Sequence, residues 1–148
     1  MSTDADDRPL DPRTDWVREH LHRYVATDGV DGHEWKPGVP TLLLTTRGRR
    51  SGKLRRTPLI YGRDGDAYVV VASYGGSPQH PDWYLNLDAE RDVEIQVGPD
   101  VMPARAATVG DADRERLWGE MTAIWPDYDQ YQARTDRQIP LVALEPAA

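Results

Sequence analysis

Short apolar runs, separated by segments that contain glycine and proline, dominate the pattern of hydrophobic and polar positions along the chain. Runs of this kind that are rich in Val, Leu, Ile and Thr are typical of β-strands. The clearest one, AYVVVAS, follows the hairpin signal Asp64-Gly65. The pattern predicts strands at residues 41–46, 57–61, 67–73, 93–97, 101–107 and 139–144.

Apolar residues at helical spacing predict a smaller number of helices. The first is amphipathic, with its apolar residues on one face, as expected for a helix that covers a core. The second begins directly after Pro81, and the third is ended by Pro126. The predicted helices span residues 16–25, 82–87 and 111–125, with a further helical turn at 127–135 and a loop at 27–40.

Many short strands and few helices favour a closed or nearly closed antiparallel sheet over a parallel βαβ stack. The chain has 148 residues, which is the usual size of one domain. We therefore predict a mainly β fold, a small barrel with flanking helices, in a single domain of residues 15–148. Residues 1–14 are acidic and are predicted to form a disordered, solvated tail.

Several kinds of site are excluded by what the sequence lacks. The absence of cysteine rules out disulfides, thiolate nucleophiles and cysteine metal sites. The four histidines (His20, His22, His33 and His80) show no metal-ligand spacing, so we expect them at the surface and predict no metal site. Neither GxSxG nor GxGxxG occurs, which argues against an α/β-hydrolase and a Rossmann domain.

The N-terminus and the hydropathy pattern bear on location. The N-terminal residues lack the features of a secretory signal, and no apolar run approaches the length of a membrane span. We therefore expect a cytoplasmic protein. Peripheral membrane contact through the amphipathic helix at 16–25 is the alternative, although its histidines and acidic residues favour core packing.

One loop concentrates positive charge in a chain whose net charge is −7. Residues 47–56, RGRRSGKLRR, hold six cations and no acid. Glycines let the main chain approach a ligand, and arginine forks bind phosphate or carboxylate oxygens in pairs, so this segment is a candidate anion site. It is not a Walker loop, because its glycine spacing is one residue short. A solvated charged hairpin is the alternative, and confinement of the cations to one loop argues against nucleic-acid binding.

Three further segments carry weaker signals. The small residues in Val71–Gly76 could let a flat ring lie against the end of a strand. Trp83–Asn86 offers an aromatic wall and a side-chain amide. Tyr128 and Tyr131 share a helical face, and their phenols can donate protons or orient an acceptor oxygen. Taken singly, these segments are better explained as a glycine turn, a core stripe and a packed aromatic pair.

Taken together, three blocks of the sequence resemble the deazaflavin-dependent nitroreductase family, also described as quinone reductases that use coenzyme F420. The blocks are TTRGRRSGKLRRTPLI, VVASYGGSPQHPDWYLNL and WPDYDQYQARTDRQIP. The likeness runs from about Thr41 to Glu145. It implies a split β-barrel of the FMN-binding type and an oxidoreductase that transfers a hydride from reduced coenzyme F420. The acceptors implied are quinones, nitroaromatics or activated alkenes.

The resemblance also implies which residues form the site. The phosphate and oligoglutamate tail of the cofactor would lie against Arg49, Arg50, Ser51, Arg55, Arg56 and Thr57, with Lys53 at the rim. The ring system would be lined by Pro58, Leu59, Ile60, Val71, Ala72, Ser73, Tyr74, Asp82, Trp83, Tyr84, Leu85 and Asn86, with Tyr131 closing the pocket. Ser73, Tyr128 and Tyr131 would face the acceptor and stabilise the negative charge that develops on it.

Two rival functions stay open on the sequence alone. FMN could replace the deazaflavin, since split barrels host both, but the arginine-rich loop favours a long polyanionic tail over one phosphate. A non-catalytic protein could bind the deazaflavin through the same loop without turning over an acceptor. The chain differs from the family pattern at Tyr74 and at Gln79-His80, which bears on the range of acceptors.

Overall fold

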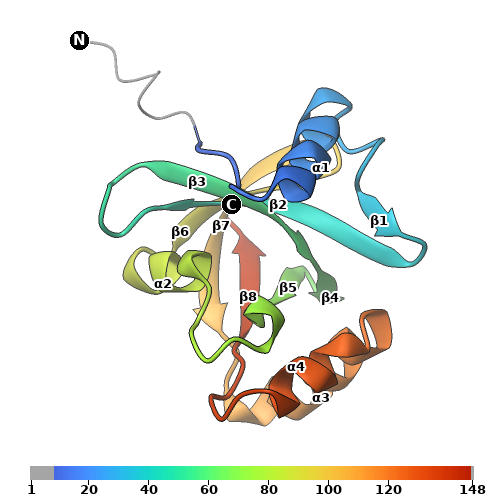
Figure 1. Ribbon diagram of the computed structural model, residues 1–148, viewed down its shortest axis with the longest axis vertical. Coiled ribbons are helices and arrows are strands. Elements are labelled where there is room, and N and C mark those ends of the chain that lie inside the picture. The colour runs from blue at the N-terminus through green and yellow to red at the C-terminus, as the bar shows by residue number, and fades with distance from the viewer. Residues whose placement is uncertain (1–8, 148) are drawn as a thin grey trace.

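In the computed structural model, residues 9–147 are described, and they form a curved antiparallel sheet with helices along its flanks (Figure 1). The strands are β1 (Glu34–Lys36), β2 (Val39–Arg47), β3 (Leu54–Ile60), β4 (Gly62–Asp64), β5 (Ala67–Val71), β6 (Asp92–Val97), β7 (Asp100–Thr108) and β8 (Leu141–Pro146). The helices are α1 (Asp15–Ala26), α2 (Asp82–Ala89), α3 (Asp111–Ile124) and α4 (Asp127–Ala133), with a short 3-10 helix, η1 (Tyr74–Gly76).

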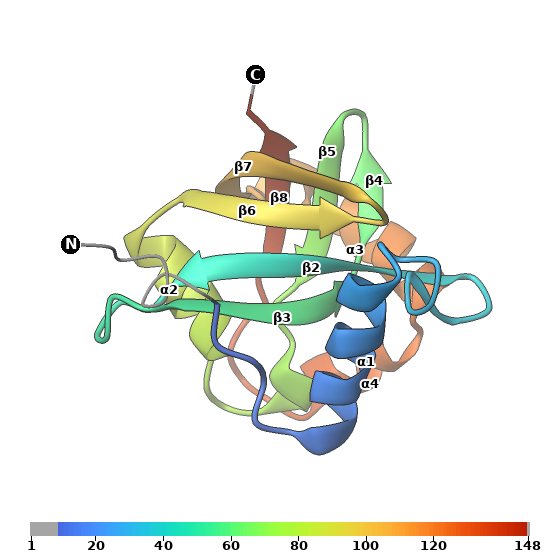
Figure 2. The same cartoon turned by 90° about the horizontal axis from the view of Figure 1, so that it is seen from above.

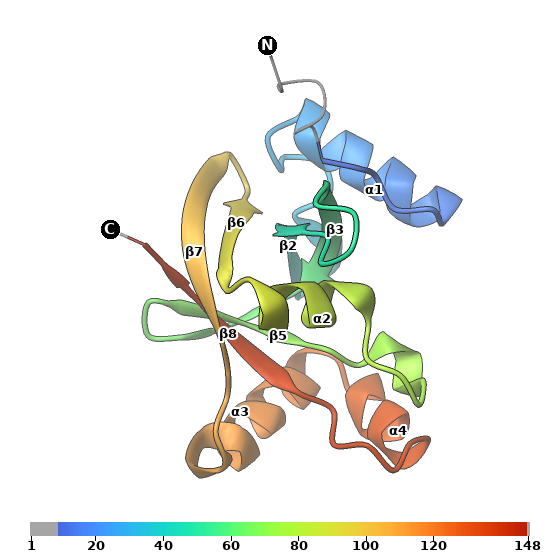
Figure 3. The same ribbon diagram turned by 90° about the vertical axis from the view of Figure 1, so that its left-hand side faces the viewer.

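The sheet has the strand order β1-β2-β6-β7-β8-β5-β4, and β3 also pairs with β2. Figures 2 and 3 show it curling into a barrel, with α1 on one side and α3 and α4 together on another. β3 and β5 come into contact without pairing, so the barrel is split between them. The predicted mainly β barrel with flanking helices is confirmed.

Alternation along β2 divides its apolar residues between two cores. Leu42 and Leu44 are fully buried in the barrel interior. Leu43, which points the other way, packs with Leu21 and Tyr24 of α1. Because side chains alternate across a strand, one apolar run both fills the barrel and anchors α1 to its outside.

β5 does the same for the C-terminal helices. Val70 lies in the barrel interior, whereas Val69 and Val71 belong to a second cluster that includes Leu117 and Met121 of α3. α4 joins this cluster, so α3 and α4 are held against the outer face of β5 and β8. Within the part of the chain that the structure describes, no helix has both the length and the hydrophobicity needed to cross a membrane.

Some strand boundaries in the structure differ from those predicted from the sequence. The predicted loop at 27–40 contains β1, and β3 begins at Leu54 rather than at residue 57. Antiparallel pairing of Leu54 with Arg47 extends β3 through the cationic residues. Arg55 and Arg56 are therefore strand residues with fixed directions, because hydrogen bonding to β2 overrides the low strand propensity of charged side chains.

The end of the predicted N-terminal tail lies against the barrel. The Leu10 N–H donates a hydrogen bond of 2.7 Å to the Leu54 carbonyl, and the Leu10 carbonyl accepts one of 3.2 Å from the Arg56 N–H. This short parallel bridge supplies partners to the edge strand β3. It is why this segment does not extend as a solvated tail. Residues 1–8 of the predicted tail lie outside the described residues.

Candidate functional site

Two adjoining cavities, of about 840 and 320 Å³, run along the opening of the barrel between α1, β3, η1 and α4. The larger is reached by the basic turn and by α2, and the smaller by α4 and by Trp35 of β1. We call the two together the groove. Residues that line both parts are Trp16, Val17, Pro58, Leu59, Val71, Ser73 and Gly75.

The basic turn at one end of the groove is a closed hydrogen-bonded loop. The Gly48 N–H donates to the Lys53 carbonyl at 2.7 Å, and the Gly52 N–H donates to the Gly48 carbonyl at 2.9 Å. A side chain at position 48 would put its Cβ 2.7 Å from the Ser51 hydroxyl and 3.1 Å from the Lys53 carbonyl oxygen, so glycine lets the turn close tightly. The tight turn presents Arg49, Arg50 and Ser51 to the larger cavity.

Arg49 is already oriented by α2. Its main-chain N–H and its Nη1 both donate to the Asn86 side-chain oxygen, at 3.2 and 2.9 Å, and its Nη2 lies 3.4 Å from the Asp82 carboxylate. Asn86 is only 2% exposed and donates in turn to the Thr46 hydroxyl at 3.3 Å. Asn86 therefore fixes the basic turn to the barrel in addition to lining the cavity.

The guanidinium of Arg56 has a hydrogen-bond donor without a partner, and an anionic ligand would supply the acceptor. Its Nε is enclosed and has no hydrogen-bond partner among residues 9–147. Buried guanidinium nitrogens are normally hydrogen-bonded, and leaving one unpaired costs free energy. Arg50 and Arg55, which also line the larger cavity, have no ion-pair partner in the described part of the chain. This end of the groove thus has spare donors for phosphate or carboxylate oxygens.

One acidic residue, which sequence analysis missed, lies among these cations. The Asp11 carboxylate accepts a hydrogen bond of 2.8 Å from His22 and lies 3.4 Å from Arg56. Burial raises the pKa of Asp11, but the hydrogen bond from His22 and the charge of Arg56 outweigh it and hold that pKa below its usual value. Asp11 is therefore ionised and offsets part of the positive potential. Only the tertiary fold brings it there.

The other end of the groove is aromatic. Trp16 stacks on Trp35, with ring centroids 6.0 Å apart and planes at 20°, and Trp35 lies 5.1 Å from Trp125. The Trp125 indole N–H donates to the Tyr131 hydroxyl at 3.4 Å. Trp16 was predicted to lie on the core-facing side of its helix, but it is 58% exposed and lines both parts of the groove. A run of aromatic rings forms a wall for a flat, apolar ligand.

The two predicted tyrosines meet at this end. Their rings are 6.1 Å apart at 75°, and the Arg134 guanidinium lies 5.5 Å from the centre of the Tyr131 ring. Burial, with a smaller effect of Tyr131, raises the pKa of Tyr128. Tyr128 therefore stays protonated and is a hydrogen-bond donor rather than an acid that gives up its proton.

The loop that carries Ser73 is held in an unusual conformation. Tyr74, Gly75 and Gly76 have φ angles of +46°, +62° and +82°, which place three successive residues in the left-handed region. A Cβ at position 76 would lie 2.6 Å from the Tyr131 carbonyl oxygen. The glycine therefore lets η1 pack directly on α4 and brings Ser73 and Tyr131 to the same cavity.

Arg137 ties this loop to the segment before β8. Its guanidinium donates to the carbonyls of Ala72, Ser73 and Ser77 at 3.2, 2.7 and 2.8 Å, and its Nη1 lies 3.2 Å from Nδ1 of His80. Burial, and then the charge of Arg137, lower the pKa of His80, so its ring is neutral beside the cation. No role was predicted for Arg137 from the sequence, although it lies in the block WPDYDQYQARTDRQIP.

Most of the predicted site residues lie in the groove. The larger cavity is lined by Arg49, Arg50, Ser51, Arg55, Arg56, Thr57, Pro58, Leu59, Val71, Ser73, Tyr74, Asp82, Trp83 and Asn86, and the smaller adds Ile60, Tyr128 and Tyr131.

Four predicted residues, Lys53, Ala72, Tyr84 and Leu85, line neither part of the groove. Ala72 is fully buried. Tyr84 faces the other way, with its ring against His80 and its hydroxyl 3.2 Å from that of Thr108.

The prediction that the four histidines lie at the surface is wrong for one of them. His20, expected at the surface, is only 4% exposed and lines the smaller cavity. It sits one turn after Trp16 on the buried face of α1, and its polarity concealed this position in the sequence pattern. Among the residues that the structure describes, no group of three histidine or acidic side chains is arranged to hold a metal ion.

The fold is that of a split barrel, and its groove is cationic at one end and aromatic at the other. The family model for F420H(2)-dependent quinone reductase matches residues 16–146, and the chain belongs to that family. The resemblance seen in the sequence is thereby confirmed.

Related proteins agree with this family. A Mycobacterium tuberculosis protein named F420H(2)-dependent quinone reductase is 45% identical over 131 residues, covering 86% of this chain and 88% of that protein. A solved F420-H2 dependent reductase is 40% identical, with a TM-score of 0.66 over 72% of this chain and 94% of that one. A structure described as a domain-swapped dimer is 39% identical, with a TM-score of 0.69, and covers 90% of this chain and 100% of its own. The predicted split-barrel fold is confirmed by these structures.

Proposed function

We propose that this protein holds reduced coenzyme F420 in the groove and transfers a hydride from it to a quinone. One observation carries the proposal. The groove has a cationic end, where a guanidinium nitrogen lacks a hydrogen-bond partner, and this end is continuous with a neutral aromatic end. Membership of the F420H(2)-dependent quinone reductase family and the name of the M. tuberculosis relative support it. When bound, the reduced deazaflavin supplies the hydride.

The basic turn and β3 would hold the anionic tail of the cofactor. Arg50 and Arg55 offer guanidinium groups without ion-pair partners in the described residues, and Arg56 offers an unpaired Nε. Paired N–H donors on arginine suit both phosphate and carboxylate oxygens. Further along β3, Thr57, Pro58 and Leu59 also line the larger cavity, and they would lie against the cofactor between its tail and its ring system.

The smaller cavity would hold the acceptor. Its volume of about 320 Å³ and its aromatic lining suit a flat, apolar molecule, and its lining contains no Asp, Glu, Lys or Arg. A neutral quinone fits that description, and nitroaromatics and activated alkenes are further candidates of the same shape. Ser73, Tyr128 and Tyr131 all line this cavity and would hydrogen-bond to the acceptor oxygen as negative charge develops there.

Location and assembly belong to the same proposal. We expect a cytoplasmic enzyme that reaches a membrane-held quinone by peripheral contact at the exposed Trp16 and Tyr74, whose side chains are 58% and 61% exposed. The relative described as a domain-swapped dimer supports testing the chain for dimers in solution by light scattering.

The test is acceptor-dependent oxidation of reduced coenzyme F420, followed by the return of the absorbance of the oxidised cofactor. We expect turnover with menadione and a lower rate with a nitroaromatic. Reduced FMN serves as the control, and we expect no comparable turnover with it. Tight binding of the deazaflavin without oxidation by any acceptor would instead identify a non-catalytic binding protein, and turnover with reduced FMN alone would identify a flavin enzyme.

A further inference from the structure

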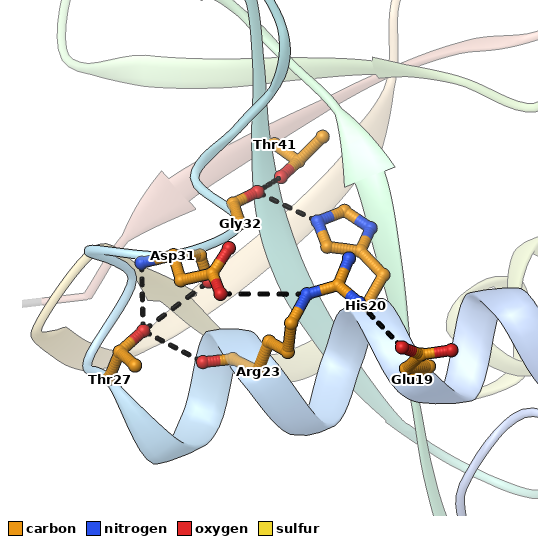
Figure 4. Close-up of polar contacts among 7 residues, drawn as sticks. All are labelled: Glu19, His20, Arg23, Thr27, Asp31, Gly32 and Thr41. Carbon is orange, nitrogen blue, oxygen red and sulfur yellow. Dashed lines mark hydrogen bonds and ion pairs between the residues drawn. The ribbon is translucent and has the colours of Figure 1, made fainter.

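A buried histidine on α1 lies at the acceptor end of the groove and has no part in the function described so far. His20 is 4% exposed, and its Nε2 lies 2.7 Å from the Gly32 carbonyl oxygen (Figure 4). The Thr41 hydroxyl donates to the same carbonyl at 2.8 Å. Because a carbonyl can only accept, Nε2 carries the hydrogen, and the tautomer of the neutral ring is fixed.

The second ring nitrogen, Nδ1, is available for chemistry. It lies on the side of the ring opposite Gly32, and it has no hydrogen-bond partner among residues 9–147. The ring position is held closely, because a Cβ at Gly32 would come within 3.1 Å of the ring and the Tyr24 ring packs edge-on at 6.4 Å. His20 is thus a fixed imidazole with one free nitrogen, and the residue lines the smaller cavity.

The surroundings of His20 contain no better proton donor. Its cavity is lined by neutral residues, and the titratable groups among them besides His20 are Tyr128 and Tyr131. Burial raises the pKa of Tyr128, which makes its phenol a weaker acid. The neighbours of His20 on α1, Glu19 and Arg23, pair with each other at 3.0 Å on the exposed side of the helix, and Arg23 also reaches Asp31 (Figure 4). Histidine is the side-chain type that exchanges protons readily near neutral pH.

We propose that His20 is the catalytic acid that protonates the acceptor oxygen. This inference rests on the proposed quinone reduction. Hydride addition leaves an electron pair on a quinone oxygen. The N–H bond at Nδ1 of protonated His20 then breaks, its electrons stay on nitrogen, and an O–H bond forms to give the hydroquinone. The quinone gains a hydride and a proton, the reduced cofactor loses a hydride and a proton, and solvent returns the proton to His20.

The test compares His20→Gln with Glu19→Gln. Glutamine can still donate to the Gly32 carbonyl but cannot transfer a proton, and Glu19 is an exposed neighbour that lines neither part of the groove. With menadione, we expect kcat of His20→Gln to fall by about 100-fold, the loss typical of removing a general acid, with the cofactor Kd unchanged. With methylene blue, a cation that becomes neutral on accepting a hydride and needs no proton, we expect less than about a threefold loss. Glu19→Gln should match the wild type with both.

A second readout needs no cofactor. Nitrogen NMR of the histidine side chains is recorded during addition of 1,4-dihydroxynaphthalene, a hydroquinone. A parallel titration followed by tryptophan fluorescence gives the concentration at which binding is saturated. The Nδ1 resonance that is missing in His20→Gln should move, and that of His33, which bonds to Tyr61 away from the groove, should not. An unmoved His20 signal, equal losses with both acceptors, or normal menadione turnover by His20→Gln would each overturn the role of His20 alone. Absence of menadione reduction by the wild type would overturn the proposed function and the inference with it.

Discussion

Arg137 donates a hydrogen bond of 2.7 Å to the main-chain carbonyl of Ser73, a residue 64 positions earlier in the chain. The same guanidinium binds the carbonyls of Ala72 and Ser77. Ser73 lines both parts of the groove, so the position of a proposed acceptor contact depends on a side chain that itself lies in the segment before β8. Arg137 is therefore a positioning residue.

Replacing Arg137 with lysine should destabilise the protein and disturb the acceptor end of the groove. Lysine carries its donors on a single nitrogen, whereas the three carbonyls are bound by three different nitrogens of the guanidinium, so at least one carbonyl loses its partner. We expect the free energy of unfolding in urea to fall by about 2–4 kcal/mol. The control is Arg105→Lys, because Arg105 is exposed and pairs with Asp92 in solvent. Equal effects of the two substitutions would contradict the proposed bracing of the Ser73 loop.

Alanine substitutions at two neighbouring glycines distinguish the effect of backbone strain on unfolding free energy from the effect of close packing. Gly75 and Gly76 both have positive φ, but a Cβ at position 75 would meet open space, whereas one at 76 would overlap the Tyr131 carbonyl. Gly75→Ala should cost about 1 kcal/mol of unfolding free energy, from strain alone. Gly76→Ala should cost about 2 kcal/mol more. Similar losses in urea denaturation would show that η1 does not pack tightly on α4.

Removing the carboxylate of Asp11 should strengthen cofactor binding. Asp11 lies 3.4 Å from Arg56 and would repel the anionic tail that Arg56 is proposed to bind. Asp11→Asn should lower the Kd for the deazaflavin about threefold at low salt, and the gain should shrink at high salt because ions screen the charge. The exposed Asp92 provides the control substitution, Asp92→Asn, with no expected change in Kd. Weaker binding by Asp11→Asn would instead make Asp11 part of the binding site.

Tyr131→Phe should reduce turnover more than cofactor affinity. The substitution keeps the ring contacts with Tyr128 and Arg134 and removes only the hydroxyl, which accepts from Trp125. We expect kcat to fall by about 10-fold to 100-fold and the cofactor Kd to stay within twofold. Tyr84→Phe, outside the groove, should change neither quantity. Unchanged kcat in Tyr131→Phe would remove the proposed role of its hydroxyl.

The features that could be predicted from the sequence are those that local pattern encodes. The continuous apolar runs of β2 and β5 reveal strands because both faces of each strand are buried, and the cationic loop is visible because its charges are adjacent in the chain. The sequence therefore predicts the cationic end of the groove.

The features that could not be predicted depend on contacts between distant segments. The periodicity of α1 shows that Trp16 and His20 share a face, but not that the barrel opens beneath them. Arg137 binds main-chain carbonyls, which leave no trace in a pattern of side chains. Asp11 meets Arg56 only because the edge of β3 accepts a further hydrogen-bonded segment.

The central claim is that the arginines of β3 hold the anionic tail of a deazaflavin. A fluorescence titration with coenzyme F420, with FMN in parallel at the same salt concentration, tests it most directly in the wild type, in Arg55→Ala/Arg56→Ala and in the exposed control Arg105→Ala. We expect binding in the micromolar range or tighter by the wild type and the control, and loss of that binding in the double variant. Undiminished binding by the double variant, or binding of FMN alone, would contradict the account.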